Sequence, residues 1–368
     1  MVKKGTKILI LGAGASIGSK RYPIRSSFDQ FRTTMPSAEN FFYDLSKVNN
    51  PEQPHLNSLN FLGLMYEGLN EVIARAWNFE SNGSDNNDWK GVNIEEVMTF
   101  FEVGINMSEP NSNERKMYIN AQESLTDYLY PSIPMVCTDQ HCEYLMKVIW
   151  ELEDKDSVIS YNWDTIADFT LQESASIRRG ELPQLRNYAK LLRDESIDIK
   201  NYRNKGILLK LHGSFNWMMC ENQDCENHNR IIPPFRNGQK KYKLLTLRET
   251  WVCPSCGGNH LKPHIIPPLS NKMIHQNSFL KKQWMIARQK LLDVEELVFI
   301  GYSFPPTDYY TEWLFRQLNF IENKEPVKIT GIKHEIKKRG SSVAKRYKTI
   351  FKGCDIESYS TLKEYSKN

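Results

Sequence analysis

The sequence has no long apolar run. No stretch approaches the roughly 18 consecutive apolar residues that a membrane-spanning helix needs, which excludes such a helix. Near the start, Lys3 and Lys4 precede a short apolar run that ends at Gly12, and the basic residues Lys20 and Arg21 follow almost at once. This leaves no credible signal-peptide cleavage region. We therefore expect a cytoplasmic protein without membrane association.

The chain also lacks a strong charge of one sign. Its 48 Lys and Arg residues against 44 Asp and Glu residues leave a net charge of +4 over 368 residues, which is too little to argue for nucleic acid. Basic residues concentrate only between Lys333 and Lys348, where a solvated helix face explains them better. We expect no direct binding to nucleic acid.

Apolar residues are abundant enough for a sizeable core. Hydrophobic residues make up 40%, aromatic residues 11% and charged residues 25% of the chain, a composition that is typical of globular proteins and excludes wholesale disorder. At roughly 150 residues per domain, the length predicts about two domains or one enlarged domain. No internal repeat is visible.

Short apolar segments predict the strands of a mainly parallel α/β sheet. The expected strands are Thr6–Leu11, Ser157–Tyr161, Gly206–Leu211, Glu296–Ile300 and Val327–Ile332. Helical segments lie between several of them, as crossovers between parallel strands require. The sequence therefore predicts a Rossmann-like, doubly wound sheet.

The segment between the first expected strand and the others has a helical rather than a strand-like pattern of apolar residues. Apolar residues recur there at helical spacing, and they form two stripes: Leu59, Leu62, Met65, Tyr66, Leu69, Val72, Ile73 and Ala76, then Ile94, Val97, Met98 and Phe101. Further helices are expected at Tyr118–Leu129 and Cys142–Leu152. We assign residues 1–25, 154–219 and 262–368 to the Rossmann-like domain, 26–153 to a helical insertion and 220–261 to a small zinc-binding module.

A glycine turn follows the first expected strand. Its residues are Gly12, Ala13, Gly14, Ala15 and Ser16, and such a turn lets a pyrophosphate approach the backbone at the start of a helix. Gly18 comes one residue late for the dinucleotide fingerprint, and no strand with a terminal acid follows ~20 residues on. A structural turn without a ligand remains the alternative.

Four of the seven cysteines form two close pairs, and an odd total argues against a disulfide framework. Four residues separate Cys220 from Cys225, two separate Cys253 from Cys256, and 27 lie between the pairs. This spacing predicts one tetrahedral, structural Zn²⁺ site with a closed coordination sphere. The nearby histidines His228, His260 and His264 are alternative ligands, and packing is the default for Cys137, Cys142 and Cys354.

Polar residues follow three of the expected strands. Asn162 and Asp164 follow one, His212 another, and Gly301 with Ser303 a third. In open α/β sheets ligands bind beyond the carboxyl ends of the strands, so these residues are candidates for one cleft with the glycine turn. Taken singly, Asn162 and Asp164 can also be helix caps, and His212 can be a structural histidine.

The order of these motifs resembles the sirtuin family, and the details resemble its bacterial branch more than the protein deacylases. Residues Ser160–Asp164 (Ser-Tyr-Asn-Trp-Asp) are similar to that branch's Thr-x-Asn-Tyr-Asp, and Lys210–Ser214 to its Lys-Leu-His-Gly-Ser. Phe299–Asp308, Phe-Ile-Gly-Tyr-Ser-Phe-Pro-Pro-Thr-Asp, looks like the matching phosphate-side motif. The resemblance spans Lys7–Ser16 and Val158–Phe351.

The resemblance implies a site that binds NAD and breaks its bond between nicotinamide and ribose. Asn162 would orient the ribose or a water, Asp164 would bind the nicotinamide carboxamide, and His212, with an ordinary pKa near ~6.5, would take a proton. Phosphates would lie against Gly14, Ala15 and Ser16, with Ser303 on the other side.

One segment departs from the deacylase pattern, and one acidic residue within the matching motifs has a structural explanation. Deacylases follow the glycine turn with Gly-Ile-Pro-Asp-Phe-Arg, whereas this chain has Tyr22–Ser26, in which Arg25 is a candidate substitute. Asp308 is interpreted as the N-cap of a helix that begins at Tyr309 rather than as a catalytic group.

Three functions follow from the resemblance. The first is an NAD glycohydrolase that resembles NAD-depleting effectors of bacterial antiphage systems, restrained by homo-oligomer assembly or a regulatory partner until triggered. The second is a protein deacylase or ADP-ribosyltransferase, which the cysteine module favours, although Pro305 and Pro306 stand where a substrate peptide would pair with the backbone. The third is a non-catalytic module that binds NAD or ADP-ribose.

Overall fold

The computed structural model describes most of the chain. The described residues are 6–17, 37–46, 49–50, 53–57, 66–79, 89–137, 142–177, 182–193, 198–228, 230–232, 234–237, 242–244, 252–258, 261–265, 278–321 and 325–367. The chain divides into two compact units. One contains Met1–Tyr22 with Asp139–Asn368, and the other contains Pro23–Thr138.

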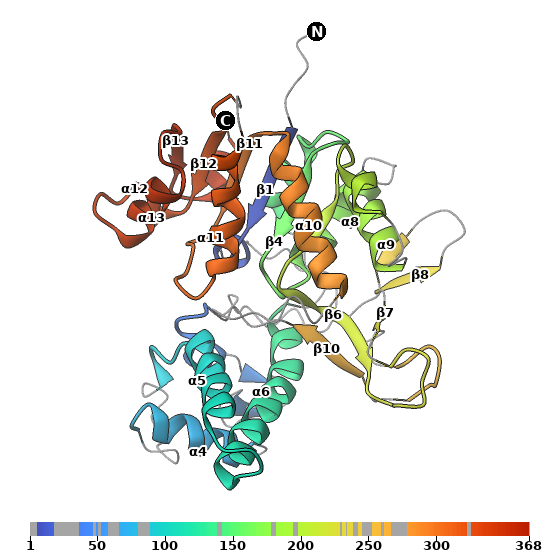
Figure 1. Ribbon diagram of the computed structural model, residues 1–368, viewed down its shortest axis with the longest axis vertical. Helices are drawn as coiled ribbons and strands as arrows, with labels where there is room; N and C mark the ends of the chain where they lie inside the picture. Colours follow the sequence, from blue (N-terminus) through green and yellow to red (C-terminus); the bar gives the residue numbers. More distant parts are fainter. Residues whose placement is uncertain are drawn as a thin grey trace. The chain divides into compact units, whose positions relative to one another are not determined.

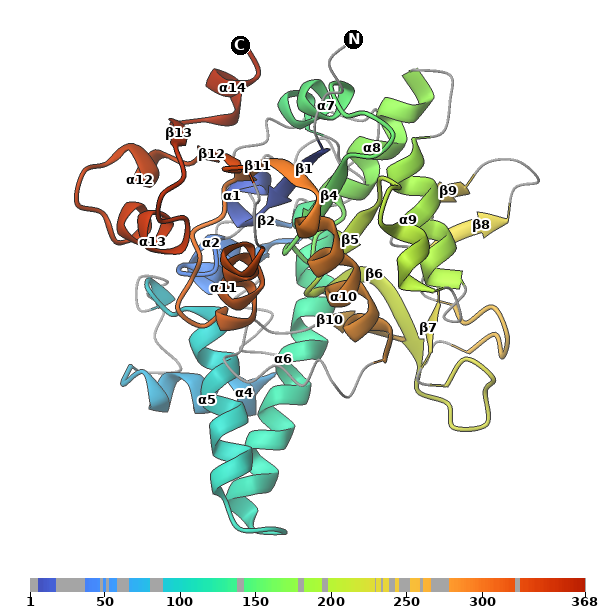
Figure 2. The ribbon, with the colours of Figure 1, turned by 45° about the horizontal axis from the view of Figure 1, so that its top comes forward.

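A six-stranded sheet forms the centre of the first unit. Its strands are β1 (Thr6–Leu11), β4 (Ser157–Ser160), β5 (Leu208–Lys210), β11 (Val294–Ile300), β12 (Lys328–Ile332) and β13 (Ile356–Tyr359). They lie in the order β13-β12-β11-β1-β4-β5, which can be followed from left to right in Figure 2, and every neighbouring pair is parallel. Taken in chain order, β1, β4 and β5 thus extend the sheet in one direction and β11, β12 and β13 in the other, with β1 beside β11 where the order reverses.

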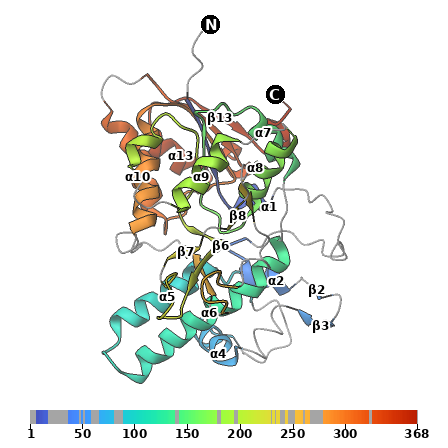
Figure 3. The ribbon, with the colours of Figure 1, turned by 90° about the vertical axis from the view of Figure 1, so that its right-hand side faces the viewer.

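Helices cover both faces of this sheet, as the continuous burial of its central strands requires. Ile8, Leu9 and Ile10 of β1 have no exposed surface. Helix α10 (Ser278–Leu292) lies on one side of the sheet, and α7 (Glu143–Trp150) and α8 (Ile166–Ile177) lie on the other (Figure 3). The chain is therefore α/β with a parallel sheet, as the sequence predicts.

The remaining helices of the first unit are short. They are α1 (Ala13–Ile17), α9 (Pro183–Arg193), the 3-10 helix η2 (Ile199–Tyr202), α11 (Tyr309–Arg316), the 3-10 helix η5 (Gln317–Phe320), α12 (His334–Lys337), α13 (Ser342–Ile350) and α14 (Leu362–Tyr365). A second sheet, in the order β10-β6-β7, is antiparallel and contains β6 (Gly213–Cys220), β7 (Ile231–Ile232) and β10 (Leu261–Ile265). A hairpin of β8 (Phe235–Asn237) and β9 (Tyr242–Leu244) completes this unit (Figure 1).

The second unit is mainly helical. Its elements are α2 (Phe41–Ser46), β2 (Asn49–Asn50), β3 (Gln53–Asn57), α4 (Glu67–Ala76), α5 (Ile94–Met107) and α6 (Asn113–Cys137). The expected stripe on α5 is confirmed, because its four apolar residues are the buried residues of that helix. Of the other stripe, Leu59, Leu62 and Met65 lie outside the described residues, and the remainder falls on or beside α4.

Two differences from the expected organisation have structural reasons. The sequence places the end of the helical insertion at residue 153, whereas the second unit ends at Thr138. The boundary lies earlier because α7, which follows it, packs against α8 of the first unit. The edge strand β13 was not expected. Its residues Ile356–Tyr359 are polar in part and only half-buried or exposed, so they lack the apolar run that marks the central strands.

Candidate functional site

The glycine turn after β1 packs directly on the loop after β11, at the place where the strand order reverses. The amide of Gly12 donates to the carbonyl of Ile300, and the amide of Gly14 donates to the carbonyl of Gly301, both at 3.0 Å. Gly301 has a φ of +66°, and a Cβ there would lie 2.2 Å from the amide nitrogen of Ala15. Glycine is therefore required at 301 by both the backbone angle and the space.

Three amides of the turn are satisfied within the protein. Besides those of Gly12 and Gly14, the amide of Ala15 donates to the carbonyl of Gly12 at 2.9 Å. Ala13 is exposed at the first position of α1, and its amide has no recorded partner among the described residues. Of the amides of Ala13, Gly14 and Ala15, those of Gly14 and Ala15 are therefore already used in hydrogen bonds within the protein.

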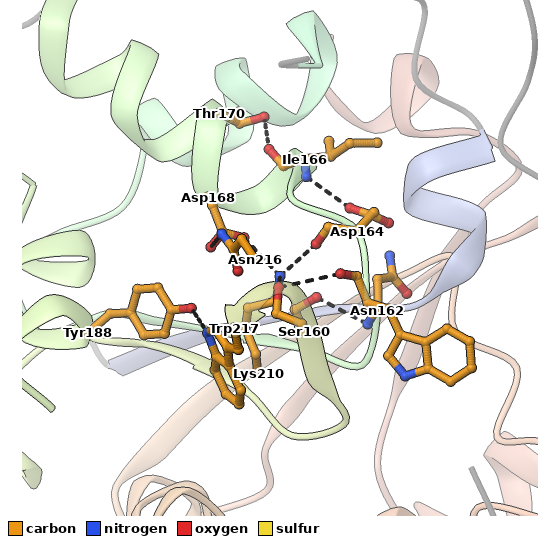
Figure 4. A network of polar contacts seen from close by, with 12 residues as sticks. Ser160, Asn162, Asp164, Ile166, Asp168, Thr170, Tyr188, Lys210, Asn216 and Trp217 are labelled. Carbon is orange, nitrogen blue, oxygen red and sulfur yellow. Dashed lines mark hydrogen bonds and ion pairs between the residues drawn. The ribbon is translucent and has the colours of Figure 1, made fainter. Parts of the chain in front are cut away.

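Asn162, just beyond β4, fastens the turn to the neighbouring strand. Its side-chain amide nitrogen donates to the carbonyl of Gly12 at 2.9 Å and to Oγ of Ser16 at 3.0 Å. Its own backbone amide donates to Oγ of Ser160 at 3.2 Å, a contact that Figure 4 shows. Both side-chain amide hydrogens of Asn162 are therefore used within the protein. A ligand can bind this side chain by donating a hydrogen bond to Oδ1.

Asp164 joins the same group and also caps the following helix. Oδ2 accepts from the Ser16 hydroxyl at 2.6 Å, and Oδ1 accepts from the amide of Ile166, the first residue of α8, at 2.9 Å. Burial raises the pKa of Asp164, and the nearby Lys210 ammonium opposes that rise. The Asp164 side chain thus contacts both the glycine turn, through Ser16, and the first residue of α8, whereas the Asn162 side chain contacts only the glycine turn.

His212 follows β5 and faces a carboxylate from another part of the chain. Its Nε2 lies 3.3 Å from Oδ2 of Asp308, and both side chains are almost completely buried. The hydroxyl of Tyr302 donates to the same carboxylate oxygen at 2.5 Å. The Tyr161 ring contacts the His212 ring edge-on at a centroid distance of 5.0 Å and stacks on the Tyr302 ring at 4.7 Å.

These contacts set the protonation of the group. Burial, and then the Asp308 carboxylate, raise the pKa of both Tyr161 and Tyr302 well above its ordinary value. The phenol of Tyr302 consequently stays protonated and donates to Asp308. Asp308 faces a ring nitrogen of His212, as the carboxylate does in catalytic histidine–carboxylate pairs, although here that nitrogen is Nε2 rather than Nδ1.

Asp308 occupies the N-cap position of α11, as the sequence predicts. Its side chain, however, makes no capping hydrogen bond, because the carboxylate points to His212 and Tyr302 instead. Asp308 is thus a site residue that the sequence argument missed. The only available indication was its place at the end of the segment Phe299–Asp308, which the resemblance had marked.

A clamp from α13 holds the loop that carries Ser303. Phe304 has a positive φ of 52°, and its carbonyl accepts a hydrogen bond from the Arg346 guanidinium. The hydroxyl of Tyr347 donates to the carbonyl of Tyr302 at 2.8 Å. Ser303 is half-buried between these two fixed residues, so its position relative to Gly301 is determined by backbone contacts rather than by its own side chain.

A fully buried lysine lies beneath the Asn162–Asp164 segment, at the centre of Figure 4. Its Nζ donates to the carbonyl of Asp164 at 2.6 Å, to Oδ2 of Asp168 at 3.0 Å and to the Ser214 hydroxyl oxygen. Asn216 donates to the other oxygen of Asp168 at 3.3 Å. We call Lys210, Asp168, Ser214 and Asn216 the Lys210 network.

The four paired cysteines converge in the second sheet. Sγ of Cys220 lies 3.7 Å from Sγ of Cys256, and Sγ of Cys225 lies 3.6 Å from Sγ of Cys253. All four sulfur atoms lie within 4.8 Å of one another. This cluster can hold one metal ion. Cys220 ends β6, which pairs with β10, so the cluster joins the loops at one end of this sheet.

Backbone turns shape both halves of the cluster. The amide of Gly257 donates to the carbonyl of Cys253, and Gly257 has a φ of +68°. On the other side, the amide of Asn227 donates to Sγ of Cys225 at 3.4 Å, and its side chain donates to Ser255 at 2.6 Å. The two halves are therefore held together by side-chain contacts as well as by the sulfur atoms.

Not every predicted residue can be placed. Gly18, Tyr22–Ser26 with Arg25, and His260 lie outside the described residues. His228 and His264 are not among the residues of the sulfur cluster, and Cys142 is buried and caps α7. The structure brings Gly12, Ser16, Asn162, Asp164 and Gly301 into one contact group, and it brings His212 next to Tyr161, the neighbour of Asn162.

The chain matches no protein-family model and no curated protein at a significant level. Among its described helices, none combines the length and the apolar character that a bilayer span demands.

Proposed function

We propose that this protein is an NAD glycohydrolase, which converts NAD and water to nicotinamide and ADP-ribose. The observation that carries the proposal is the Asn162 side chain, which joins the glycine turn to β4 beside the His212–Asp308 pair. The strand order supports it, because it is the order of Rossmann-like dinucleotide-binding sheets, in which the ligand lies at the reversal point beyond the carboxyl ends. The resemblance to the sirtuin motifs is the reason for proposing NAD as the substrate and the nicotinamide–ribose bond as the bond that is cleaved.

In the proposed complex the pyrophosphate lies against the glycine turn and the loop after β11. Gly12, Gly14 and Gly301 let the turn and this loop pack closely on each other, and the pyrophosphate would lie beside that contact, at the start of α1. Because the amides of Gly14 and Ala15 are already used, we assign the polar phosphate contacts to the amide of Ala13 and to Ser303. Asp164 and Ser16 remain the candidates for the nicotinamide carboxamide.

The proposed chemistry places a water opposite the leaving nicotinamide. Cleavage develops positive charge on the ribose, and nicotinamide leaves as a neutral molecule when the carbon–nitrogen electron pair returns to its ring. Oδ1 of Asn162 orients the water or a ribose hydroxyl. The His212 imidazole takes one proton from the attacking water, and the Asp308 carboxylate stabilises the resulting imidazolium.

The variants Asn162→Ala and His212→Ala test these roles. We expect purified wild-type protein to release nicotinamide and free ADP-ribose from NAD without any peptide, and each variant to lose about 100-fold or more in kcat. Chromatography of the products, with and without an acetylated peptide, is the measurement. Turnover that requires the peptide would instead identify a deacylase, and unchanged turnover in both variants would place the reaction elsewhere.

We further propose that the sulfur cluster holds one structural zinc ion. Two Zn–S bonds of about 2.3 Å at a tetrahedral angle place their sulfurs about 3.8 Å apart, close to the two measured separations of 3.6 and 3.7 Å. Four thiolates fill the coordination sphere, so the metal would stabilise the module at 220–261 rather than activate water. We therefore assign it no part in the NAD reaction.

Substitution of one ligand tests the zinc assignment. We expect one zinc per chain in the purified protein, and we expect Cys253→Ser to lose the metal and to lower the unfolding temperature of the protein. Cys354→Ser, at a half-buried cysteine outside the cluster, is the matched control and should keep the metal. Elemental analysis and thermal unfolding give the two readouts. A metal-free wild type, or a Cys253→Ser variant of unchanged stability, would refute the assignment.

The resemblance to NAD-depleting antiphage effectors also supplies a proposed setting. An enzyme that destroys NAD is toxic to its own cell, so we propose that a regulatory protein partner, which is absent from the purified protein, restrains it until phage infection. The second unit contains none of the residues proposed for catalysis or NAD binding. It is therefore the candidate for binding the regulatory partner.

A further inference from the structure

The Lys210 network connects the two segments that carry the proposed catalytic residues. The ammonium group of Lys210 has three hydrogens, and the structure gives each one an acceptor. One acceptor is the carbonyl of Asp164, two residues after Asn162, and another is the hydroxyl of Ser214, two residues after His212. The third is the carboxylate of Asp168, which balances the charge.

The rest of the network fixes the same two segments. The amide of Phe215 donates to the carbonyl of Trp163 at 2.9 Å, and Asn216 donates to Asp168 at 3.3 Å. Lys210 and Asp168 have no exposed side-chain surface. A buried ion pair is weak evidence for stability, because apolar residues of similar volume often stabilise a fold equally well. The geometry of the pair therefore needs another explanation.

We infer that Lys210 is a positioning residue, which sets the place of Asn162 relative to His212 through one buried ammonium group. Its contacts fall on the backbone and hydroxyl groups beside the two catalytic residues rather than on the catalytic side chains themselves. A displacement of about 1 Å between reacting groups costs on the order of 100-fold in rate. The directional hydrogen bonds of Lys210 can prevent such a displacement, whereas apolar packing has no fixed direction. The inference rests on the proposed NAD hydrolysis.

A charge-balanced pair of substitutions separates positioning from stability. Lys210→Met alone leaves Asp168 as an unpaired buried carboxylate and should lower the unfolding temperature. Lys210→Met combined with Asp168→Asn removes both charges and should recover most of that loss. We expect kcat for NAD to stay about 100-fold below wild type in the double variant, with KM changed by less than about threefold.

Lys290→Met is the matched control. Lys290 is also a buried lysine, but it lies on α10 and donates to the carbonyls of Arg203 and Lys205, away from the Asn162 and His212 segments. Its loss should lower stability without changing kcat. A double variant with wild-type kcat, or an equal loss of kcat in Lys290→Met, would overturn the inference.

Hydrogen exchange provides a readout that does not depend on catalysis. In the double variant we expect the amides of Phe215 and Ile166, which donate to Trp163 and Asp164, to exchange about 10-fold or more faster than in wild type, while the amides of β1 keep their protection. Unchanged exchange at both amides would refute the positioning role even if the wild-type protein does not cleave NAD. Failure of the proposed function would appear separately, as intact NAD with wild-type protein.

Discussion

Gly301→Ala is expected to lower the free energy of unfolding by about 3 kcal/mol or more and to abolish NAD turnover. The left-handed backbone angle of Gly301 alone costs an alanine roughly 1–2 kcal/mol. The added Cβ would also lie 2.2 Å from the amide nitrogen of Ala15 and 2.4 Å from Cα of Gly14. Neither neighbour is a flexible side chain, so the glycine turn itself must move.

Gly340→Ala isolates the contribution of the backbone angle. Gly340 has a similar φ of +83°, and a Cβ there would meet no atom within 4 Å. We expect this variant to lose only about 1–2 kcal/mol and to keep its turnover. Denaturant unfolding and NAD turnover of both variants provide the comparison. Equal losses would mean that contact between the glycine turn and the loop after β11 is unimportant.

The second large effect is expected for Asp308→Asn, with a fall in kcat of about 100- to 10,000-fold. Asparagine keeps the size of the side chain and can still accept from the Tyr302 hydroxyl. It cannot stabilise the imidazolium of His212, and its amide group allows the wrong histidine tautomer. Because Asp308 contacts no proposed part of the substrate, KM should change little, and steady-state kinetics separate the two parameters.

Asp156→Asn is the control for replacing a buried aspartate. Asp156 is 3% exposed and accepts from the amides of Lys7 and Glu153, at the amino ends of β1 and β4. An asparagine would turn its NH2 group toward one of these two donating amides, so the replacement should cost some stability and leave kcat unchanged. A turnover loss of the same size in both variants would remove the special role of Asp308.

The central strands and the cysteine cluster could be predicted because each depends on local sequence. Buried parallel strands are rich in apolar residues, such as Ile8–Leu11 in the first strand and Val158 with Ile159 in β4. Four sulfur atoms around one point require two close pairs of cysteines, and the spacing of the cysteines shows both pairs. The polar residues expected at the carboxyl ends of the strands do lie there.

The partner of His212 could not be predicted, because 95 residues separate His212 from Asp308 and only the packing of the loop after β11 brings them together. The same holds for the satisfied amides of Gly14 and Ala15. The partner of Gly14 is Gly301, which is distant in the sequence, and the partner of Ala15 is Gly12 within the same turn, whose folding depends on that packing. The charge pairing of Lys210 with Asp168 likewise joins β5 to α8, and the local pattern around either residue contains no trace of the other.

The most direct test of the central claim is the product balance when wild-type protein is incubated with NAD alone. We expect nicotinamide and free ADP-ribose in equal amounts, with no acceptor present and with the reaction lost in His212→Ala. Recovery of intact NAD from protein that binds it at the glycine turn would contradict NAD hydrolysis and would identify a binding module instead.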